Sequence, residues 1–524
     1  MRIISLKPGH DGAIAALDTS AAELIYSYEA EKDSFPRYSA INPTSALDAA
    51  GRLDAIPDVI AVGGWSKTGI AGDSPVAAGY YGIAQGSEVV GEKTIFGKRV
   101  HFYSSTHERS HLWGSYGMSP FPAGMPCYAL IWEGALGDFY EIDQYLQVVH
   151  LGQVMACPGN KFAFLYALAD PKFTLPNGLR NEDAGKLMAL CAFGKDGLPD
   201  RDEQALFDFL LPRDSIVRSL SKEDLRNSPY YNIGVTHQNF TNLARRFSDA
   251  IFDSFHTFAK KNLTKGFPLL ISGGCGLNCE WNRRWVETNL FSDVFIPPCT
   301  NDTGSAIGTA VDAMRHFTGH AKIKWSVYSG QPFVFDEFDR TGLEVHSLDY
   351  GQIASALLDD KVIGWVQGNC EIGPRALGNR SILAAPFSKA SHERLNRIKK
   401  REGFRPIAPV CLEGDVALHF DLARPSPYML LFQKVLDSRL EAVTHVDGTA
   451  RAQTVSQEQN PHLFQLLTSF KAKSGVGVLC NTSLNFNGTG FINRASDLLT
   501  YAQAVGLDGF VINDAFYLLK EAIA

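Results

Sequence analysis

The sequence lacks the features that mark several common protein classes. No stretch of its 524 residues approaches the ~18–20 consecutive apolar residues of a membrane-spanning helix. The opening MRIISLKPGHDG has neither the basic region nor the apolar core of a signal peptide. None of the nine cysteines forms a CxxC pair, which argues against zinc ribbons and thioredoxin chemistry. These absences favour a reduced, cytoplasmic protein without a membrane partner.

An excess of positive charge is also absent. The formal net charge is −7 at pH 7, so the surface as a whole is not suited to hold nucleic acid. With 45% hydrophobic and 20% charged residues, the composition is that of a globular protein that buries a large core. We therefore expect no nucleic-acid partner, and the sequence leaves open whether the chain forms a homo-oligomer.

Buried-strand patterns alternate with helical patterns along the chain. RIISL, DVIAV, YALIW, PLLIS, KVIGW and VGVLC are apolar runs that end in glycine-bearing or polar turns. One long helical stripe, at spacings of four, four and three, comprises Phe247, Ile251, Phe255 and Phe258. This alternation predicts an α/β (mixed α/β) fold. The density of motifs falls around residues 320–345, so we place the main domain boundary near 340, between regions 1–340 and 345–524.

Two histidines in STHERSHLWGSYG form the sharpest pattern of the N-terminal region. His107 and His111 are four residues apart, so on a helix they share one face, a common arrangement for two metal ligands. Asp302, at the start of a small-residue helix pattern, would complete a set of two histidines and one carboxylate. Such a set favours Fe(II), with Zn, Mn or Mg as competitors. The alternative interpretation is a pair of surface or capping histidines.

Further polar residues follow the strand patterns. His10 and Asp11 come at the end of the first strand, where side chains are well placed to meet a ligand, although Asp11 and Gly12 could equally supply a hairpin turn. Two later glycine turns would bring backbone N–H groups to phosphate oxygens. They contain Glu133, Gly134, Gly273, Gly274 and Asn278. Neither fits a Walker or Rossmann pattern, and the second could be a tight strand-to-helix turn.

The C-terminal region gathers arginines and lysines beside glycines and prolines. They occur in GNCEIGPRALGNRSILA, NRIKKREGFRPIAP and THVDGTARAQTV, followed by the polar turn LCNTSLNFNGTGFI. Guanidinium groups grip phosphate oxygens bidentately and offset the repulsion between two phosphorylated substrates. The candidate anion-binding residues are Arg375, Arg380, Lys399, Arg401, Arg405, Arg451, Asn481 and Ser483. The alternative is a solvated or RNA-binding basic face.

The order of these motifs resembles one family. A strand with an acidic turn, HxxxH, an EG turn, an SGG turn and an aspartate-bearing turn are similar to a branch of the sugar-kinase/actin-type ATPases. That branch includes the tRNA threonylcarbamoyl transferase and the NodU/CmcH/TobZ-type carbamoyltransferase family. GPRALGNRSIL, FRPxAP, HVDGxxRxQ and NTSxN resemble the YrdC-like domain of the carbamoyltransferases. The resemblance implies a double-lobed ATPase-like region followed by a YrdC-like domain.

The resemblance also implies a reaction. The C-terminal domain would convert carbamoyl phosphate and ATP, with Mg, into carbamoyladenylate, and the metal-bearing domain would pass the carbamoyl group to a small-molecule alcohol. By motif, His107, His111 and Asp302 would hold the metal, and Arg451 would act on the phosphates or the carbamoyl group. His10, as general base, and Asp11 would line the acceptor side.

The acceptor is less clearly indicated. KPGHDGAIAAL and EKDSFPRYS most resemble the 3-hydroxymethylcephem O-carbamoyltransferases of β-lactam antibiotic biosynthesis. Aminoglycoside, nucleoside, macrolide and aminocoumarin hydroxyls stay open as acceptors. The rival functions are a small-molecule kinase of the same superfamily, a tRNA-modifying carbamoyl enzyme and a regulatory ATP sensor. The arginine-rich C-terminal region argues against the kinase, and the acidic charge balance argues against tRNA.

Overall fold

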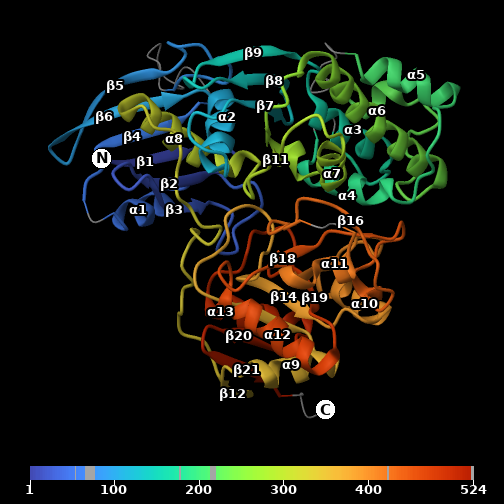
Figure 1. Ribbon diagram of the computed structural model, residues 1–524. Coiled ribbons are helices and arrows are strands. Elements are labelled where there is room, and N and C mark those ends of the chain that lie inside the picture. The colour runs from blue at the N-terminus through green and yellow to red at the C-terminus, as the bar shows by residue number, and fades with distance from the viewer. Residues whose placement is uncertain (54, 65–76, 176–178, 213–219, 422–423, 521–524) are drawn as a thin grey trace. The chain divides into compact units, whose positions relative to one another are not determined.

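A computed structural model describes residues 1–53, 55–64, 77–175, 179–212, 220–421 and 424–520 (Figure 1). The described chain is a mixed α/β protein, as predicted, with main sheets of six, five and eight strands. Contacts group it into two compact units: residues 1–118, 302–444 and 448–524, and residues 119–301 and 445–447. The boundary predicted near residue 340 falls inside the first unit, and a domain division at that point stays a prediction.

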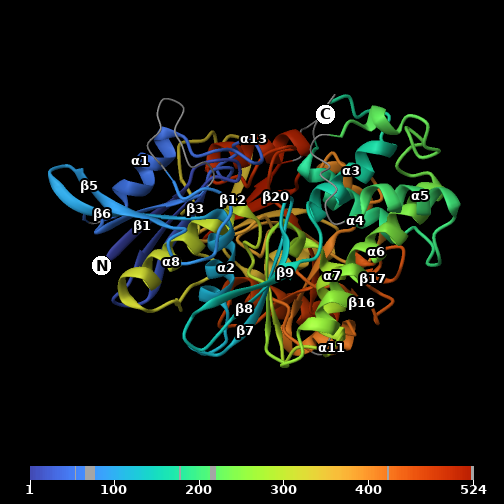
Figure 2. The ribbon, with the colours of Figure 1, turned by 90° about the horizontal axis from the view of Figure 1, so that it is seen from above.

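The N-terminal sheet of the first unit has the strand order β3-β2-β1-β4-β6-β5. Strand β1 pairs antiparallel with β2 and parallel with β4, so the first two strands form a hairpin. Helix α8 packs on β1, β2 and β4 and also contacts α2 (Figures 1 and 2). The elements are β1 (Arg2–Lys7), β2 (Ala13–Asp18), β3 (Glu23–Glu29), α1 (Pro43–Gly51), β4 (Val59–Gly63), β5 (Val89–Ile95), β6 (Lys98–Ser105), α2 (His107–Met118) and α8 (Ser305–Thr318).

The C-terminal part of the first unit is built on the eight-stranded sheet, with the order β12-β21-β20-β13-β14-β19-β15-β18. Its strands are β12 (Leu343–Ser347), β13 (Ile363–Val366), β14 (Arg380–Ala384), β15 (Ala408–Leu412), β18 (Gln453–Val455), β19 (Val478–Ser483), β20 (Gly509–Ile512) and β21 (Ala515–Leu519). A separate two-stranded sheet joins β16 (Gln433–Lys434) to β17 (Thr449–Ala450). The helices are α9 (Tyr350–Leu358), α10 (Lys389–Ile398), α11 (Val416–His419), α12 (Pro461–Ser474) and α13 (Ala495–Val505).

Both faces of the eight-stranded sheet are buried. Along β13, Trp365 joins an apolar core with α9 and α12, whereas Val366 joins a second core with α10 and α13. Consecutive residues of a strand point to opposite faces, so a nearly continuous apolar run is what a strand covered on two sides requires. This explains why KVIGW and VGVLC lack polar alternation.

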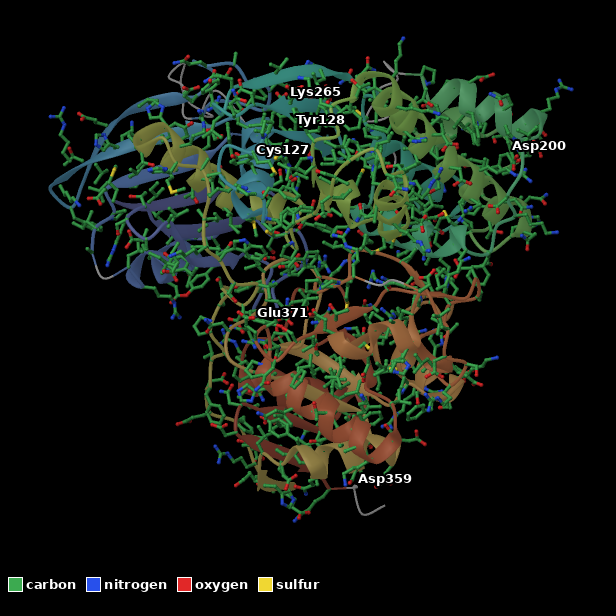
Figure 3. All side chains as sticks on the ribbon, in the orientation of Figure 1. Cys127, Tyr128, Asp200, Lys265, Asp359 and Glu371 are labelled. Carbon is green, nitrogen blue, oxygen red and sulfur yellow. The ribbon has the colours of Figure 1, made fainter. Side chains whose placement is uncertain are left out.

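The second unit contains a five-stranded sheet with the order β11-β10-β7-β8-β9. The predicted stripe lies on α6, where Phe247, Ile251 and Phe255 are fully buried and Phe258 is half-buried. The strands are β7 (Cys127–Trp132), whose first two residues are labelled in Figure 3, β8 (Gly137–Ile142), β9 (Val148–Gln153), β10 (Leu269–Ser272) and β11 (Val294–Phe295). The helices are α3 (Pro158–Ala169), α4 (Asn181–Cys191), α5 (Arg201–Leu210), α6 (Gln238–Asn262) and α7 (Cys279–Glu287).

Length and apolarity together decide whether a helix can span a bilayer. Among the helices of the described residues, none meets both requirements.

Candidate active site

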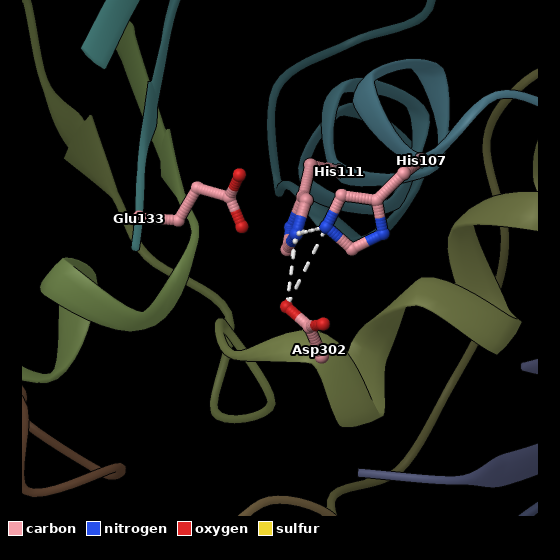
Figure 4. A group of neighbouring side chains, drawn as sticks. All are labelled: His107, His111, Glu133 and Asp302. Carbon is pink, nitrogen blue, oxygen red and sulfur yellow. Dashed lines mark hydrogen bonds and ion pairs between the residues drawn. The ribbon is translucent and has the colours of Figure 1, made fainter. Parts of the chain in front are cut away.

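The three predicted metal ligands come together in the first unit. Helix α2 begins at His107, so His107 and His111 lie one turn apart, and Asp302 lies on the short η4 turn (Asp302–Gly304) that leads into α8. The Nε2 atoms of His107 and His111 are 3.1 Å apart. Asp302 Oδ1 lies 3.7 Å from His107 Nε2 and 3.3 Å from His111 Nε2. Figure 4 shows both imidazoles leaving the same helix and meeting the carboxylate. The three side chains offer two nitrogen donors and one oxygen donor to a single ion.

The charge state of Asp302 suits a metal ligand. Burial acts to raise its pKa, but His107, Lys7 and His111 hold the pKa well below the usual value. Lys7 Nζ lies 3.2 Å from Asp302 Oδ2, and its side chain is buried. The carboxylate is therefore ionised at neutral pH, as a ligand must be. The sequence patterns missed Lys7, although its place at the end of the first strand, in KPGHDG, is a usable signal.

The turn between β1 and β2 joins this cluster. Asp11 has a φ of 51° in the hairpin connection, so the hairpin interpretation is correct. Its Oδ2 atom lies 2.9 Å from His10 Nδ1, while His10 Nε2 is 3.8 Å from Asp302 Oδ2. Because a carboxylate oxygen accepts hydrogen bonds, His10 Nδ1 is the donor in this contact, which leaves Nε2 as the ring nitrogen nearer to Asp302. A turn residue thus orients a histidine that is partly exposed.

The two predicted glycine turns lie at the carboxyl ends of two neighbouring strands of the sheet in the second unit. Strands β7 and β10 are adjacent and parallel, and each turn follows the carboxyl end of its strand. Gly273 has a φ of 101°, and a Cβ there would lie 2.6 Å from the Trp132 carbonyl carbon. Only glycine permits this approach. Asn278 caps α7 by accepting from the amides of Glu280 and Trp281, at 3.1 and 3.2 Å.

Glu133 and Gly134 form the other of these two turns. Glu133 is buried, and its Oε1 atom accepts from the amide of Leu136 at 3.3 Å. A Cβ on Gly134 would lie 3.1 Å from Asn160 Oδ1, which is tight packing. Glu133, Gly134, Gly273 and Gly274 are therefore neighbours, and their contact with a nucleotide stays a prediction.

Several cations of the C-terminal part influence one another. Burial and the guanidinium groups of Arg405 and Arg451 lower the pKa of Arg401 to about 9. Burial, with Arg401, Arg405 and Arg37, holds the pKa of Lys399 well below its usual value. A positive cluster with too little negative charge around it attracts anions. Arg37, from EKDSFPRYS, was not predicted as part of this cluster.

The ammonium group of Lys399 is hydrogen-bonded to the protein itself. Its Nζ donates to the carbonyl oxygens of Ser483 and Asn485, at 2.6 and 3.1 Å, and to Asn485 Oδ1 at 2.5 Å. Ser483 Oγ also donates to Asn485 Oδ1, at 2.6 Å. Lys399 therefore fixes the NTSLN turn, while direct contact with a phosphate stays a prediction.

The GPRALGN loop is organised by a residue that the sequence did not reveal as important. Glu371, labelled in Figure 3, is fully buried. Its Oε1 atom accepts from the amides of Leu377, Asn379 and Arg380 at 2.7, 2.9 and 3.1 Å. One carboxylate therefore closes the loop on itself, with Arg375 half-buried between the ends. A glutamate between a cysteine and an isoleucine carries no sequence pattern that would have shown this.

Arg380 differs from the other arginines of the cluster. It is fully buried and donates to Asn493 Oδ1 and to the carbonyl oxygens of Gln367, Gly368 and Asn379 at 2.7–3.0 Å. These contacts make it a structural residue in this conformation, and its predicted contact with a phosphate stays untested.

Two other predicted residues have unsatisfied buried atoms. Arg451 Nε and Asn481 Oδ1 lack a hydrogen-bond partner among the described residues. Buried polar atoms are normally paired, so each such atom calls for water or a ligand. Asn481 Nδ2 donates to Ala376 O at 3.2 Å and to Gln453 Oε1 at 2.9 Å, which places it beside the GPRALGN loop.

Comparisons with known proteins agree over the whole chain. Residues 76–311 match the family model described as Carbamoyltransferase N-terminus, and residues 354–519 match Carbamoyltransferase C-terminus. The chain is 48% identical to the 3'-hydroxymethylcephem-O-carbamoyltransferase of Amycolatopsis lactamdurans, over 99% of this chain and 100% of that protein. It is 47% identical to the protein of the same name from Streptomyces clavuligerus, over 99% of each. It is 32% identical to Nodulation protein U of Bradyrhizobium diazoefficiens, over 95% of this chain and 94% of that protein.

The chain belongs to the carbamoyltransferase family. Its prediction as a carbamoyltransferase enzyme is thereby confirmed. Among solved structures, an archaeal actin homologue is 10% identical and covers 60% of this chain and 100% of its own, with a TM-score of 0.28. This likeness is too weak to assign a fold, so the actin-type and YrdC-like architectures stay predictions.

Proposed function

We propose that this enzyme carbamoylates the hydroxymethyl group of a 3'-hydroxymethylcephem, with carbamoyl phosphate as the carbamoyl source and ATP as the activating substrate. The acceptor rests on one observation: two relatives named for this reaction match the full chain at 48% and 47% identity. The opening hairpin and EKDSFPRYS, which resemble the same enzymes, lie in regions covered by these matches.

A screen of alcohols tests the acceptor. Purified enzyme with carbamoyl phosphate and ATP is offered the hydroxymethylcephem, an aminoglycoside, a nucleoside and an aminocoumarin, and products are detected by mass spectrometry. We expect the cephem to give the highest kcat/KM. A higher value for another alcohol would replace the acceptor and leave the carbamoyltransferase assignment intact.

The proposed first half-reaction uses the cations of the C-terminal part. Carbamoyl phosphate and water give carbamate and phosphate, and a carbamate oxygen then attacks the α-phosphorus of ATP, with pyrophosphate leaving. Arg401, Arg405 and Arg451 would offset the repulsion between the anions and stabilise the charge that develops. The buried, unpartnered Nε of Arg451 and the lowered pKa of Arg401 support an anion at this position.

The proposed second half-reaction uses the hairpin turn. The acceptor hydroxyl attacks the carbamoyl carbon of the adenylate, and AMP leaves with the bonding electron pair. His10 Nε2 would take the hydroxyl proton, with its ring oriented by Asp11 at 2.9 Å. The donor set of His107, His111 and Asp302 fits a divalent ion, Fe(II) by preference, which when bound supplies a Lewis acid to a phosphate or carbonyl oxygen.

A further inference from the structure

The stretch that follows β3 contacts both predicted half-sites of the first unit. We call residues 29–39 the docking segment. Its two ends hold the hairpin turn, because the Gly12 carbonyl accepts from the Ala30 amide at 2.7 Å and the Gly12 amide donates to the Ser39 carbonyl at 2.8 Å. Along its length it contacts residues 488–494 of the C-terminal part. Its contacts there are Ser34 N to Phe491 O, Arg37 N to Gly488 O and Gly490 N to Phe35 O, each 2.9 Å, and the ion pair of Asp33 with Arg494.

At the centre of the docking segment is a buried lysine. Lys32 is 2% exposed, and its Nζ donates to the carbonyl oxygens of Glu371 and Gly373 at 2.5 and 2.9 Å. Glu29 Oε2 lies 3.4 Å from the same nitrogen, and Glu29 Oε1 accepts from the Gly373 amide at 2.5 Å. The ammonium also lies 4.5 Å from the centre of the Phe491 ring. Burying a charge is costly unless it is paired and hydrogen-bonded, and these contacts meet that requirement.

Lys32 and Glu371 act on the same loop from two sides. The Glu371 carboxylate gathers the amides of Leu377, Asn379 and Arg380, while Lys32 holds the carbonyls at the beginning of the loop. Arg375 lies between these anchors. An arginine on a loop binds an anion more tightly when the loop is already held in place, since ordering the loop on binding costs free energy.

We propose that Lys32 is a positioning residue that holds loop 371–380 in its anion-binding conformation from the N-terminal sheet. It touches no substrate itself and acts through the loop that carries Arg375. The docking segment thus links the acceptor-side hairpin to the carbamoyl-phosphate side. The kinetic consequence rests on the proposed function, whereas the conformational one does not.

Lys32→Met and the milder Glu29→Gln test this inference. In hydrogen exchange we expect Lys32→Met to speed exchange of the Leu377, Asn379 and Arg380 amides at least about tenfold, with β13 and β19 unchanged. We expect the KM for carbamoyl phosphate, measured by acceptor-independent pyrophosphate release, to rise about tenfold while kcat changes less than about threefold. Glu29→Gln should show smaller effects in the same direction. Unchanged protection of the loop, or loss of protection across the whole sheet, would refute a positioning role.

A backbone variant gives a second test if Lys32→Met folds poorly. A Cβ on Gly490 would collide with the carbonyl of Glu31, so Gly490→Ala pushes the docking segment away without removing a charge. Gly414→Ala is the matched control, because no atom lies within 4 Å of its added Cβ. We expect only Gly490→Ala to speed exchange in loop 371–380. Should the wild-type enzyme not use carbamoyl phosphate at all, the proposed function fails, and the exchange data still decide the role of Lys32.

Discussion

At the scale of single residues, the two buried histidines of α2 give the most direct test of the site. Metal analysis of the purified protein should find about one transition-metal ion per chain. The double substitution His107→Ala and His111→Ala should remove it, because two of three ligands are lost, while the exposed His320→Ala should retain it. Full retention of metal in the double variant would eliminate the site. Zinc in place of iron would change only the ion.

Lys399 makes a second residue-scale prediction, which concerns pH. Its pKa in the folded protein is well below the unfolded value of about 10.4, so the unfolded chain binds more protons between the two values. Its contribution to the free energy of unfolding is therefore fully present above the unfolded pKa and is lost as pH falls through the folded pKa. A bound phosphate favours the charged form and offsets that loss. We expect inorganic phosphate to raise Tm most near neutral pH and progressively less toward about pH 10.

Thermal unfolding with phosphate, and with chloride at equal ionic strength, measures this effect. Lys399→Met should flatten the pH dependence of the phosphate shift. The same rise in Tm at every pH would show that phosphate binds elsewhere, or that Lys399 is not coupled to the anion.

At the scale of elements, the metal ligands depend on how α2 meets α8. Gly308 is in backbone contact with Ser110, so the two helices cross without side chains between them. One turn further along α8, the buried Asp312 accepts from Tyr103, Ser105 and Arg109 at 2.7–2.8 Å. This network fixes the two helices relative to each other, and hence His107 and His111 relative to Asp302.

Asp312→Asn tests that dependence. Removing one partner of a buried ion pair leaves the Arg109 guanidinium with only the Glu88 carboxylate, 3.6 Å away, which should lower the free energy of unfolding by about 3–5 kcal/mol. Denaturant unfolding measures the change, and metal content measured on the folded fraction should fall. The exposed pair of Arg284 with Asp253 supplies the control, since Asp253→Asn should cost less than about 1 kcal/mol. Equal effects of the two substitutions would exclude a special role for the network.

Local patterns were enough to predict the elements but not their partners. The apolar runs became β1, β4, β7, β10, β13 and β19, and the HxxxH spacing produced a helix with both imidazoles on one face. Lys32 could not be identified, because its partners are carbonyl groups far away in sequence. Glu371 could not be identified either, because the amides that it binds come together only once the loop has folded. Lys7 follows a recognisable pattern, but its partner Asp302 lies far along the chain. Arg380 shows the converse: an arginine close to a glycine turn resembles an anion ligand until the carbonyls around it are known.

At the scale of the whole molecule, the compact units are not continuous in sequence. The N-terminal sheet belongs to one unit with residues 302–444 and 448–524, although residues 119–301 separate them in sequence. A reading along the chain detects falling motif density near residue 340, but it cannot detect that α8 returns to the first sheet. Pairing of distant segments depends on tertiary packing, which no local pattern encodes.

Two substitutions in the first unit should separate the proposed half-reactions. Arg451→Ala should cut ATP–pyrophosphate exchange driven by carbamoyl phosphate by ~10²–10³, because a lost charged contact to the reacting phosphate costs on the order of 3–4 kcal/mol. His10→Ala should leave that exchange nearly intact while transfer to the acceptor falls by ~10²–10⁴, as expected for a lost general base.

The exposed Arg439→Ala serves as control for the loss of an arginine, and it should change neither half-reaction. A direct-transfer enzyme would show no exchange and no acceptor-independent release of pyrophosphate. Product formed from carbamoyl phosphate without ATP would therefore refute the adenylate route, and the carbamoyltransferase assignment would stand. If His10→Ala instead lowered both half-reactions equally, the hairpin turn would belong to adenylate formation as well, and another group would have to take the acceptor's proton.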